Sequence, residues 1–519
     1  MIDPLDKSPD AAFSNSVAPP KIYRCGALTY TKPALAVLFF WLLWGDVCYT
    51  LMEAVTGPIM QLKFKTLGAM NWQMALLTST VPMVIYFGFG PVIGFKSDRF
   101  RSRLGRRIPF LLFSVPMLAL GLTVLAFGDR LGLWLHAVLH LSALSANQTV
   151  MLTLGLLLAV FTFFNTFTTT IFWYLFNDVV PEHLLARFMS WFRTISTISA
   201  AGYQFFVFPY SESHSTAIFL GAAALYLVGF GLMCINVREG EYPPAPAYVD
   251  GHTGPLAAIK TYAVECHSHR IYWYLWLCTF IGCIGGGVAT FDLYFRQAVG
   301  LDLVQISKIN GSLLIIVSVL ILASGWLGDR YGPIRVVLAS QILAWVTLTP
   351  ASLFWLFWRP QPGATWTFHL SFLQHVPMLH SYAVFEIQQV FLVALVIYVG
   401  ITAPIAALNS MWDPPMLMRT FPRSRYGQFC STNALWRTAG FLLGGFLAGV
   451  FFDVLTPYVG KDRAYCYGPL WSILFSVPSF ILFLKFYQSW KRCGGDESYV
   501  APVLVSSQDT VCELSSTGA

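Results

Sequence analysis

The chain alternates between long apolar stretches and short polar segments over almost its whole length. A helix that crosses a membrane needs about 20 mostly apolar residues, because the hydrocarbon core is about 30 Å thick and a helix rises about 1.5 Å per residue. The pattern therefore predicts an all-α membrane protein with twelve transmembrane helices. The twelve runs lie at about 34–59, 72–95, 109–127, 150–178, 187–209, 216–236, 271–295, 310–328, 333–357, 389–411, 429–453 and 469–488.

A polar gap after the sixth run divides the twelve runs into two groups of six. The gap holds four prolines and mixed charges, which are typical of a soluble linker. We therefore predict a cytoplasmic N-terminal tail, a six-helix bundle, a cytoplasmic linker, a second six-helix bundle and a cytoplasmic C-terminal tail. Their boundaries are 1–32, 33–237, 238–269, 270–490 and 491–519.

Charge supports this topology. Charged residues make up 11% of the chain and hydrophobic residues 56%, whereas soluble proteins carry about 25% charged residues. With the N-terminus inside the cell, 22 Lys and Arg residues fall in inner segments and 8 in outer segments. Cytoplasmic loops retain positive charge, so we expect both termini in the cytoplasm, in a plasma membrane or a bacterial inner membrane. The net charge of +7 then needs no nucleic-acid partner.

Two loop motifs recur in both groups. Gly-x-x-x-Asp-Arg follows the second run at 94–99 and the eighth run at 325–330. A proline followed seven residues later by phenylalanine comes after the fourth run, at 181 and 188, and after the tenth, at 422 and 429. The similar offsets indicate that the second half repeats the first. Duplicated carriers commonly bind their substrate between the two repeats.

These motifs also carry a family resemblance. Gly-x-x-x-Asp-Arg after the second helix resembles the signature loop of the major facilitator superfamily. The extended loop 97–110, the segment 178–189 and the pair Phe291-Asp292 are similar to the glycoside–pentoside–hexuronide cation symporters and the plant-type sucrose/proton symporters. The superfamily resemblance covers about 33–490. It implies the major facilitator fold of two six-helix bundles and the transport of a sugar.

The resemblance also implies a gate. Asp98 is expected to dock against the N-terminus of a helix in the other half, where a carboxylate is favoured, and to pair with the arginines beside it. The alternative is that the positive charges only set the topology. The gating residues implied in this way are Asp98, Arg99, Arg106 and Arg107, with Asp329 and Arg330 as a weaker latch in the second half.

Two carboxylates lie inside the first run. Asp46 and Glu53 are seven residues apart, so they share one face of the helix. Burial disfavours the charged form of a carboxyl group, so such a group can bind and release a proton. We expect Asp46, and after it Glu53, to couple transport to protons; the alternative is a carboxyl group neutralised for packing. The plant-type relatives carry an aspartate in the fourth helix where this chain has Thr162, which also favours the first helix.

A polar face in the fourth run is the candidate binding site. Asn165, Thr169 and Trp173 recur every four residues and present an amide, a hydroxyl and a flat aromatic ring, as sugar binding requires. The alternative is that the threonine bonds its own helix and the ring packs in the core. In the seventh run Asp292 follows three glycines and matches the family position, so we expect it to contact substrate; otherwise it is a helix-end group.

Several function classes are disfavoured. The ten cysteines form no CxxC pair, and His136 and His140 have no third ligand nearby, so no metal site is expected. We find no phosphate-binding loop for ATP-driven transport and no catalytic constellation for an enzyme. No cofactor is expected beyond a coupling ion, H⁺ or alternatively Na⁺.

The leading hypothesis is a secondary active sugar carrier of the lipid bilayer, functional as a monomer, that works by alternating access with proton symport. The first alternative keeps the fold and changes the solute to a drug or an organic ion. The second is a non-transporting membrane sensor or enzyme.

Overall fold

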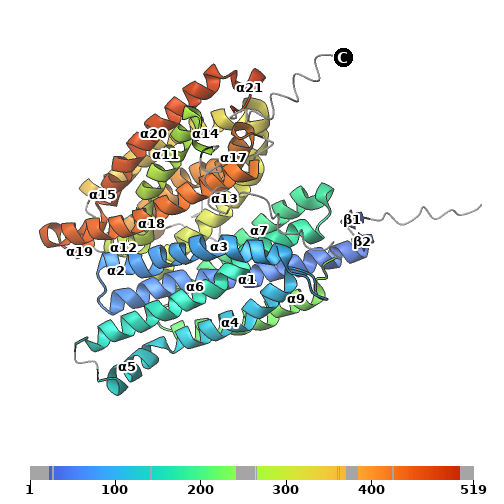
Figure 1. Ribbon diagram of the computed structural model, residues 1–519. Helices are drawn as coiled ribbons and strands as arrows, with labels where there is room; N and C mark the ends of the chain where they lie inside the picture. Colours follow the sequence, from blue (N-terminus) through green and yellow to red (C-terminus); the bar gives the residue numbers. More distant parts are fainter. Residues whose placement is uncertain are drawn as a thin grey trace, which may run out of the picture.

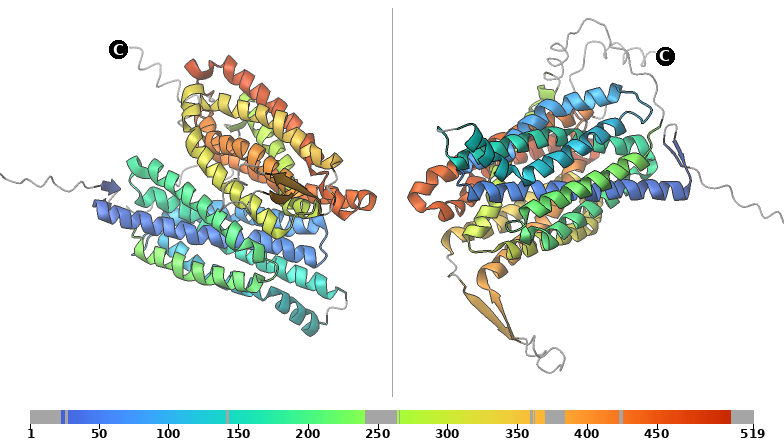
Figure 2. Two further views of the ribbon diagram at one scale, coloured as in Figure 1. Left: turned by 180° about the vertical axis from the view of Figure 1, so that it is seen from behind. Right: turned by 90° about the horizontal axis from the view of Figure 1, so that it is seen from below.

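The computed structural model describes most of the two predicted bundles and little of the predicted tails and linker. The described residues are 23–25, 28–140, 143–240, 264, 266–358, 361, 363–369, 384–422 and 426–502. Nearly all of them are helical. Two antiparallel hairpins accompany the helices: β1 (Tyr23–Cys25) with β2 (Leu28–Tyr30), and β3 (Thr365–His369) with β4 (Val384–Gln388). The second hairpin projects away from the helices (Figure 2).

The first half contains six membrane-crossing segments, some of which are interrupted by π-helical turns. Its elements are α1 (Lys32–Thr66), α2 (Asn71–Ala75), η1 (Leu76–Thr80), α3 (Val81–Arg99), α4 (Ile108–Ala126), α5 (Gly128–Val138), α6 (Ala146–Val179), α7 (Glu182–Phe206), η2 (Phe208–Tyr210), α8 (Ser215–Leu225), η3 (Tyr226–Phe230) and α9 (Gly231–Asn236).

The second half repeats this plan with six further segments. Its elements are α11 (Arg270–Gly286), η4 (Gly287–Phe291), α12 (Asp292–Ala298), α13 (Leu303–Tyr331), α14 (Pro333–Leu343), η5 (Ala344–Leu348), α15 (Thr349–Phe357), α16 (Gln389–Leu395), η8 (Val396–Thr402), α17 (Ala403–Thr420), α18 (Tyr426–Val459), α19 (Lys461–Tyr465), α20 (Gly468–Arg492) and α21 (Gly495–Ser498).

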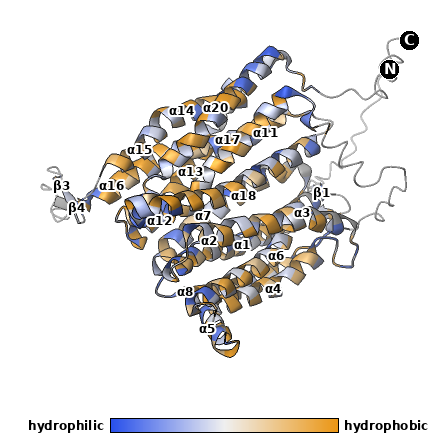
Figure 3. Cartoon of the chain, turned by 60° about the vertical axis from the view of Figure 1, so that its left-hand side comes forward, coloured by the Kyte–Doolittle hydropathy of each residue, from blue (hydrophilic) through white to orange (hydrophobic). Residues whose placement is uncertain are grey.

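The predicted number of spans is confirmed. Among the described residues, eleven helical segments are long and apolar enough to cross a membrane. The twelfth is α7, which is 25 residues long but more polar. It tolerates this polarity because it packs between α1 of its own half and α13 of the other half. Apolar residues cover most of the length of the helices (Figure 3).

The two bundles lie side by side and diverge toward one end (Figure 1). We call the end at which α1 begins and α20 finishes the terminal end, and the opposite end the distal end. Among the described residues, the hydrogen bonds that join the halves are concentrated toward the distal end, where α1 finishes and α2 begins. Gln61 of α1 donates to the carbonyl of Thr290 at 3.3 Å, and the Tyr294 hydroxyl donates to the carbonyl of Gln61 at 2.7 Å.

Asp453 of α18 makes the most extensive of these connections. Its carboxylate accepts the backbone N–H groups of Asn71 and Trp72, at 3.1 and 2.9 Å, and the Asn71 side-chain amide at 3.0 Å. The first N–H groups of a helix have no partner within the helix and favour a negative charge. A residue of the second half therefore caps α2 of the first half. Tyr465 completes the set by donating to Asn71 Oδ1 at 2.6 Å.

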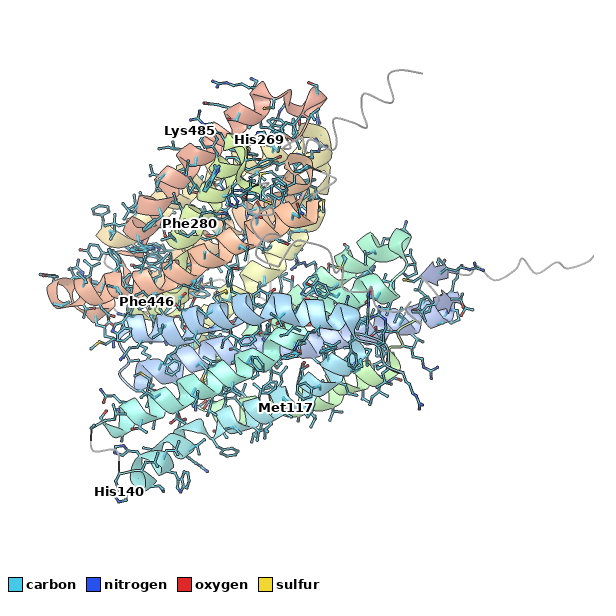
Figure 4. The ribbon with its side chains drawn as sticks, in the orientation of Figure 1. Met117, His140, His269, Phe280, Phe446 and Lys485 are labelled. Carbon is cyan, nitrogen blue, oxygen red and sulfur yellow. The ribbon has the colours of Figure 1, made fainter. Side chains whose placement is uncertain are left out.

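Close backbone packing surrounds this cap. A Cβ atom at Gly449 would lie 2.8 Å from the Trp72 Cα, so only glycine lets α18 approach α2 this closely. The Trp72 ring meets the Phe446 ring edge-on at 6.4 Å, at the boundary between the halves (Figure 4). On the other side of the interface, the Ser307 hydroxyl of α13 donates to the carbonyl of Gln204 of α7.

We predict that Asp453→Ala loosens the distal end. The substitution leaves buried donors without an acceptor, which costs about 1–3 kcal/mol. Spin labels at positions 213 and 461, one in each half, should then show a larger population of long distances by pulsed electron resonance. Asp129→Ala is the matched control, because Asp129 pairs with Lys63 inside one half. An unchanged distance distribution in Asp453→Ala would contradict the prediction.

Candidate functional site

Polar side chains of α1 and α6 form a hydrogen-bonded cluster inside the first bundle. The Tyr49 hydroxyl donates to Glu53 Oε1 at 2.6 Å and lies 2.8 Å from the Thr169 hydroxyl. The Asn165 amide donates to the same Glu53 oxygen at 3.1 Å. The structure thus brings Glu53, Asn165 and Thr169 together. Sequence reasoning missed Tyr49, although it lies one turn before Glu53 on the same helix face.

Two acceptor groups of this cluster could bind a ligand: the Glu53 carboxylate and the Asn165 side-chain oxygen. Glu53 is exposed although it lies well inside a membrane-crossing helix. A carboxylate in contact with hydrocarbon is costly, so we infer that Glu53 faces the space between the halves. Asn165 Oδ1 is buried and has no hydrogen-bond partner among the residues that the structure describes. An unpaired buried acceptor costs about 1–3 kcal/mol, which a rotation of the amide toward a ligand hydroxyl would recover.

Asp46 lies on the same face of α1, two turns nearer the terminal end, in a different environment. Its side chain is buried, with only 1% of the residue exposed. It accepts a hydrogen bond of 2.5 Å from the Ser196 hydroxyl of α7 and a longer one of 3.4 Å from Thr50. Sequence reasoning missed Ser196, because a sequence does not show which helix packs against α1.

Arg193 lies one turn before Ser196 on α7. Its guanidinium carbon is 5.2 Å from the centre of the Trp173 ring, within the range of a cation–π contact. Trp173 also packs edge-on against Phe192 at 5.1 Å. The ring is therefore partly buried between aromatic neighbours and Arg193. Trp173 belongs to the same face of α6 as Asn165 and Thr169, which lie two turns and one turn before it.

A second layer of hydrogen bonds holds α6 in place behind the cluster. The buried Thr168 hydroxyl lies 2.9 Å from that of Ser114 on α4 and 3.1 Å from that of Tyr226 in η3. The π-helical turn η3 also packs closely on α1, since a Cβ atom at Gly229 would collide with Cys48 Sγ. These contacts fix α1 and α6 relative to each other, and with them the cluster.

The structure places Asp292 in a different group of residues. Arg296 pairs with its carboxylate at 2.6 Å, and the Tyr398 hydroxyl donates to it at 3.0 Å. The Arg296 guanidinium also stacks 3.8 Å from the centre of the Tyr398 ring and donates to Asn310 at 2.6 Å. Asp292 is thus held within the second half and does not join the cluster of Glu53 and Asn165.

The arginines of the loop between α3 and α4 are bound within the first half. Arg106 and Arg107 both pair with Asp178 at the end of α6, at 2.5 and 3.0 Å. The Glu239 carboxylate, which follows α9, accepts the backbone N–H groups of Arg106, Arg107 and Ile108 at 2.6–2.9 Å. Glu239 therefore caps the N-terminus of α4, and Asp178 neutralises the two arginines beside it.

The second half has an equivalent arrangement at the same end. Asp496, which follows α20, pairs with Arg335 at the start of α14 at 2.9 Å and with Arg419 at 3.6 Å. In each half, an acidic residue after the sixth crossing segment thus holds the start of the third. Arg437 and Asp413 form a further pair of this half at 3.6 Å. Sequence reasoning assigned no role to Glu239 or Asp496, although their matching positions in the two halves were visible.

The remaining gating predictions stay open. The side chains of Asp98, Arg99 and Asp329 lie outside the described part of the structure. Arg330 is exposed, with its guanidinium 5.5 Å from the centre of the Tyr331 ring. In this conformation Arg106 and Arg107 form ion pairs with Asp178 inside the first bundle.

Solved structures share this fold. A bacterial homologue of the human lysosomal transporter Spinster, inward-facing and unoccupied, has a TM-score of 0.58 and 12% identity, with 88% of this chain and 99% of that chain covered. The nucleoside transporter NupG has a TM-score of 0.56 and 14% identity, covering 86% and 99%. The D-xylose–proton symporter has a TM-score of 0.52 and 12% identity, covering 87% and 97%. At these identities the likeness concerns the fold.

Among curated proteins, no sequence matches the chain significantly. The family described as MFS/sugar transport protein matches residues 45–386, from α1 into the second half. This match covers more than half of the chain and agrees with the two-bundle fold. The chain therefore belongs to the MFS/sugar transport protein family, a family of multi-pass membrane transporters.

Proposed function

We propose that the protein is a secondary active transporter that moves a sugar across the membrane by alternating access and couples this movement to protons. The observation that carries the proposal is the cluster of Tyr49, Glu53, Asn165 and Thr169, with Trp173 on the same helix face. It combines hydrogen-bonding groups with an aromatic ring inside a membrane-crossing bundle. One chain supplies both bundles, so we propose a functional monomer.

The chemistry of the cluster suits a neutral solute with several hydroxyl groups. Glu53 offers an exposed carboxylate, and Asn165 offers an acceptor that has no partner within the described protein. Hydrogen bonds to a charged acceptor are stronger than those between neutral groups. Trp173 offers an apolar ring against which the C–H face of a sugar can pack. The D-xylose–proton symporter and the nucleoside transporter NupG, which share the fold, make a sugar-bearing solute a reasonable choice.

Asp46 is our candidate for the proton site. It is buried and bonded to a neutral hydroxyl, that of Ser196, at 2.5 Å. A carboxyl group in this setting can bind a proton in one conformation and release it when the surrounding helices separate. Asp46 shares one face of α1 with Glu53, so a movement of α1 that accompanies substrate binding would reach both groups.

The distribution of contacts suggests the state of the transport cycle. If both termini are cytoplasmic, as the positive charges predict, the distal end faces outward and the cap on α2 closes the outer side. The conformation is then inward-facing, as is that of the bacterial Spinster homologue. In the opposite state the contacts of Asp453 would break, and the loops that carry Asp98 and Asp329 would close the terminal end.

The proposal is tested by uptake into proteoliposomes. Labelled sucrose, maltose, glucose and xylose, together with a nucleoside as a comparison, are offered with and without an imposed pH gradient or sodium gradient. We expect at least one sugar to accumulate, and to do so in response to the pH gradient. Uptake of no sugar, or uptake that responds to neither gradient, would refute the proposal.

We predict that Asp46→Asn separates accumulation from exchange. Asparagine keeps the shape of the side chain but cannot exchange a proton, so a pH gradient should no longer drive accumulation. Exchange of labelled for unlabelled sugar needs no net proton movement and should remain near the wild-type rate. Undiminished accumulation in Asp46→Asn would remove Asp46 as the coupling group.

We also predict that Asn165→Ala weakens sugar binding. Loss of one hydrogen bond between neutral groups costs about 1–1.5 kcal/mol, so KM should rise about tenfold with a smaller change in kcat. Thr162→Val is the matched control, because Thr162 lies one turn away on α6 and bonds the carbonyl of Leu158 in its own helix. Equal KM values for Asn165→Ala and the wild type would place the substrate elsewhere.

A further inference from the structure

A cavity lies within the second half, separate from the cluster on α1 and α6. Its volume is about 460 Å³, which is within the range of sites that hold drug-sized ligands. Its walls come from η4 and α12, from α14, η5 and α15, from η8, and from α18 to α20. Its lining residues belong to the second half alone, and they lie toward the distal end of these segments.

The cavity results from a difference between the two halves. In the first half the third crossing segment, α4, packs closely against the sixth, which begins with α8. In the second half the equivalent segments are α14 to α15 and α20, and α15 packs against α20 much less extensively. On the terminal side the ring of Trp345, a lining residue, packs against the Phe480 ring of α20, with the ring centres 6.1 Å apart. The third and sixth crossing segments therefore pack closely in the first half, whereas in the second half they leave space for the cavity.

Two π-helical turns border the cavity, one on each side. In η5 and η8 the helix is widened. The hydroxyls of Thr349, just after η5, and Thr402, the last residue of η8, donate to carbonyls five residues earlier, at 3.5 and 3.0 Å. Both threonines line the cavity. Single π-helical turns inside α-helices occur frequently at functional sites. Their position here supports a binding role for the cavity.

The wall chemistry indicates a neutral, amphiphilic occupant. Trp345 and Trp355 offer flat apolar surfaces, whereas Gln341, Ser352 and Ser472 offer neutral hydrogen-bonding groups. Asp292 also reaches the cavity, but its charge is balanced by Arg296. The described lining residues include no lysine or arginine, so they offer no positive charge to an anionic headgroup.

The position of the cavity indicates where its occupant comes from. In Figures 1 and 3, α14 and α20 form the side of the second half that faces away from the first half. Around the cavity this side carries exposed apolar residues: Val346 of η5 is 67% exposed and Leu474 of α20 is 65% exposed. Such a surface is suited to hydrocarbon. A route between α15 and α20 therefore leads to the bilayer.

We propose that this cavity binds a neutral, hydroxyl-bearing lipid of the sterol type, which enters from the membrane between α15 and α20. The rigid apolar body of the lipid packs against Trp345 and Trp355, and its hydroxyl bonds to neutral polar groups of the lining, such as Gln341, Ser352 or Ser472. The bound lipid fills the gap that closer helix packing fills in the first half, and so stabilises the second half.

Photolabelling tests the proposal. The full chain in phosphatidylcholine liposomes is irradiated with a diazirine analogue of cholesterol, and the labelled peptides are identified. We expect labels on α15 and α20 that unlabelled cholesterol reduces at least about fivefold. Ala344→Phe places a ring in the cavity and should lower labelling by a similar factor. Val346→Phe, which introduces the same ring at a position exposed on this side, should leave labelling within about twofold of the wild type.

Folding is checked by gel filtration and by thermal unfolding, so the test does not depend on sugar transport. If Ala344→Phe does not fold, Ser352→Leu replaces it, with the same expected loss. Equal labelling of the wild type and the cavity-filling variant would overturn the proposal. So would labels confined to other helices, and so would competition by sucrose in place of cholesterol, which would identify a sugar site.

Discussion

The most extensive hydrogen-bonded contact between the two bundles is the capping of α2 by the Asp453 carboxylate. Two backbone N–H groups and one side-chain amide of the first half converge on a single carboxylate of the second. Gly449, one turn earlier on α18, lets the two backbones come close enough for this contact. Because the three hydrogen bonds need donor–acceptor distances near 3 Å, a separation of the halves at this end would break all of them together. Such a contact suits the alternating access that we propose.

The other charged contacts keep each half rigid. Glu239 and Asp178 bind the start of α4 and its arginines to the rest of the first bundle, and Asp496 binds the start of α14 in the second. These ties lie at the terminal end, where the bundles diverge. In the proposed transport cycle, a change of state would therefore move the halves as units and leave the helices within each half in place. The cluster of Tyr49, Glu53 and Asn165 then keeps its geometry while access to it changes.

The sequence was sufficient to predict the twelve spans, the repeat of the halves and the polar faces of α1 and α6. Hydropathy and helical periodicity are local properties, so they can be read directly from the sequence. To predict that Asn165 and Thr169 lie near Glu53, only one further fact was needed, namely that α1 and α6 are neighbours. The contacts of Asp453 and Ser196 could not be predicted, because they depend on which helices meet and at what depth. The spacing of four residues between Asp292 and Arg296 indicated that the two side chains lie side by side on one helix. That Asp292 lies apart from the cluster could not be predicted, because this depends on tertiary packing.

Asp46 and Glu53, the two carboxylates of α1, lie in opposite environments. This difference is relevant to the proposed coupling of sugar movement to protons. Asp46 is buried against Ser196, whereas Glu53 is exposed and bonded to Tyr49 and Asn165. A proton site that is shielded from water does not exchange freely with the solution, and a substrate site must be open to it. The two functions therefore suit two different residues. In the proposed cycle Tyr49 lies between them on the same helix, so a sugar that draws Glu53 or Thr169 away from the Tyr49 hydroxyl would change the packing of α1 next to Asp46.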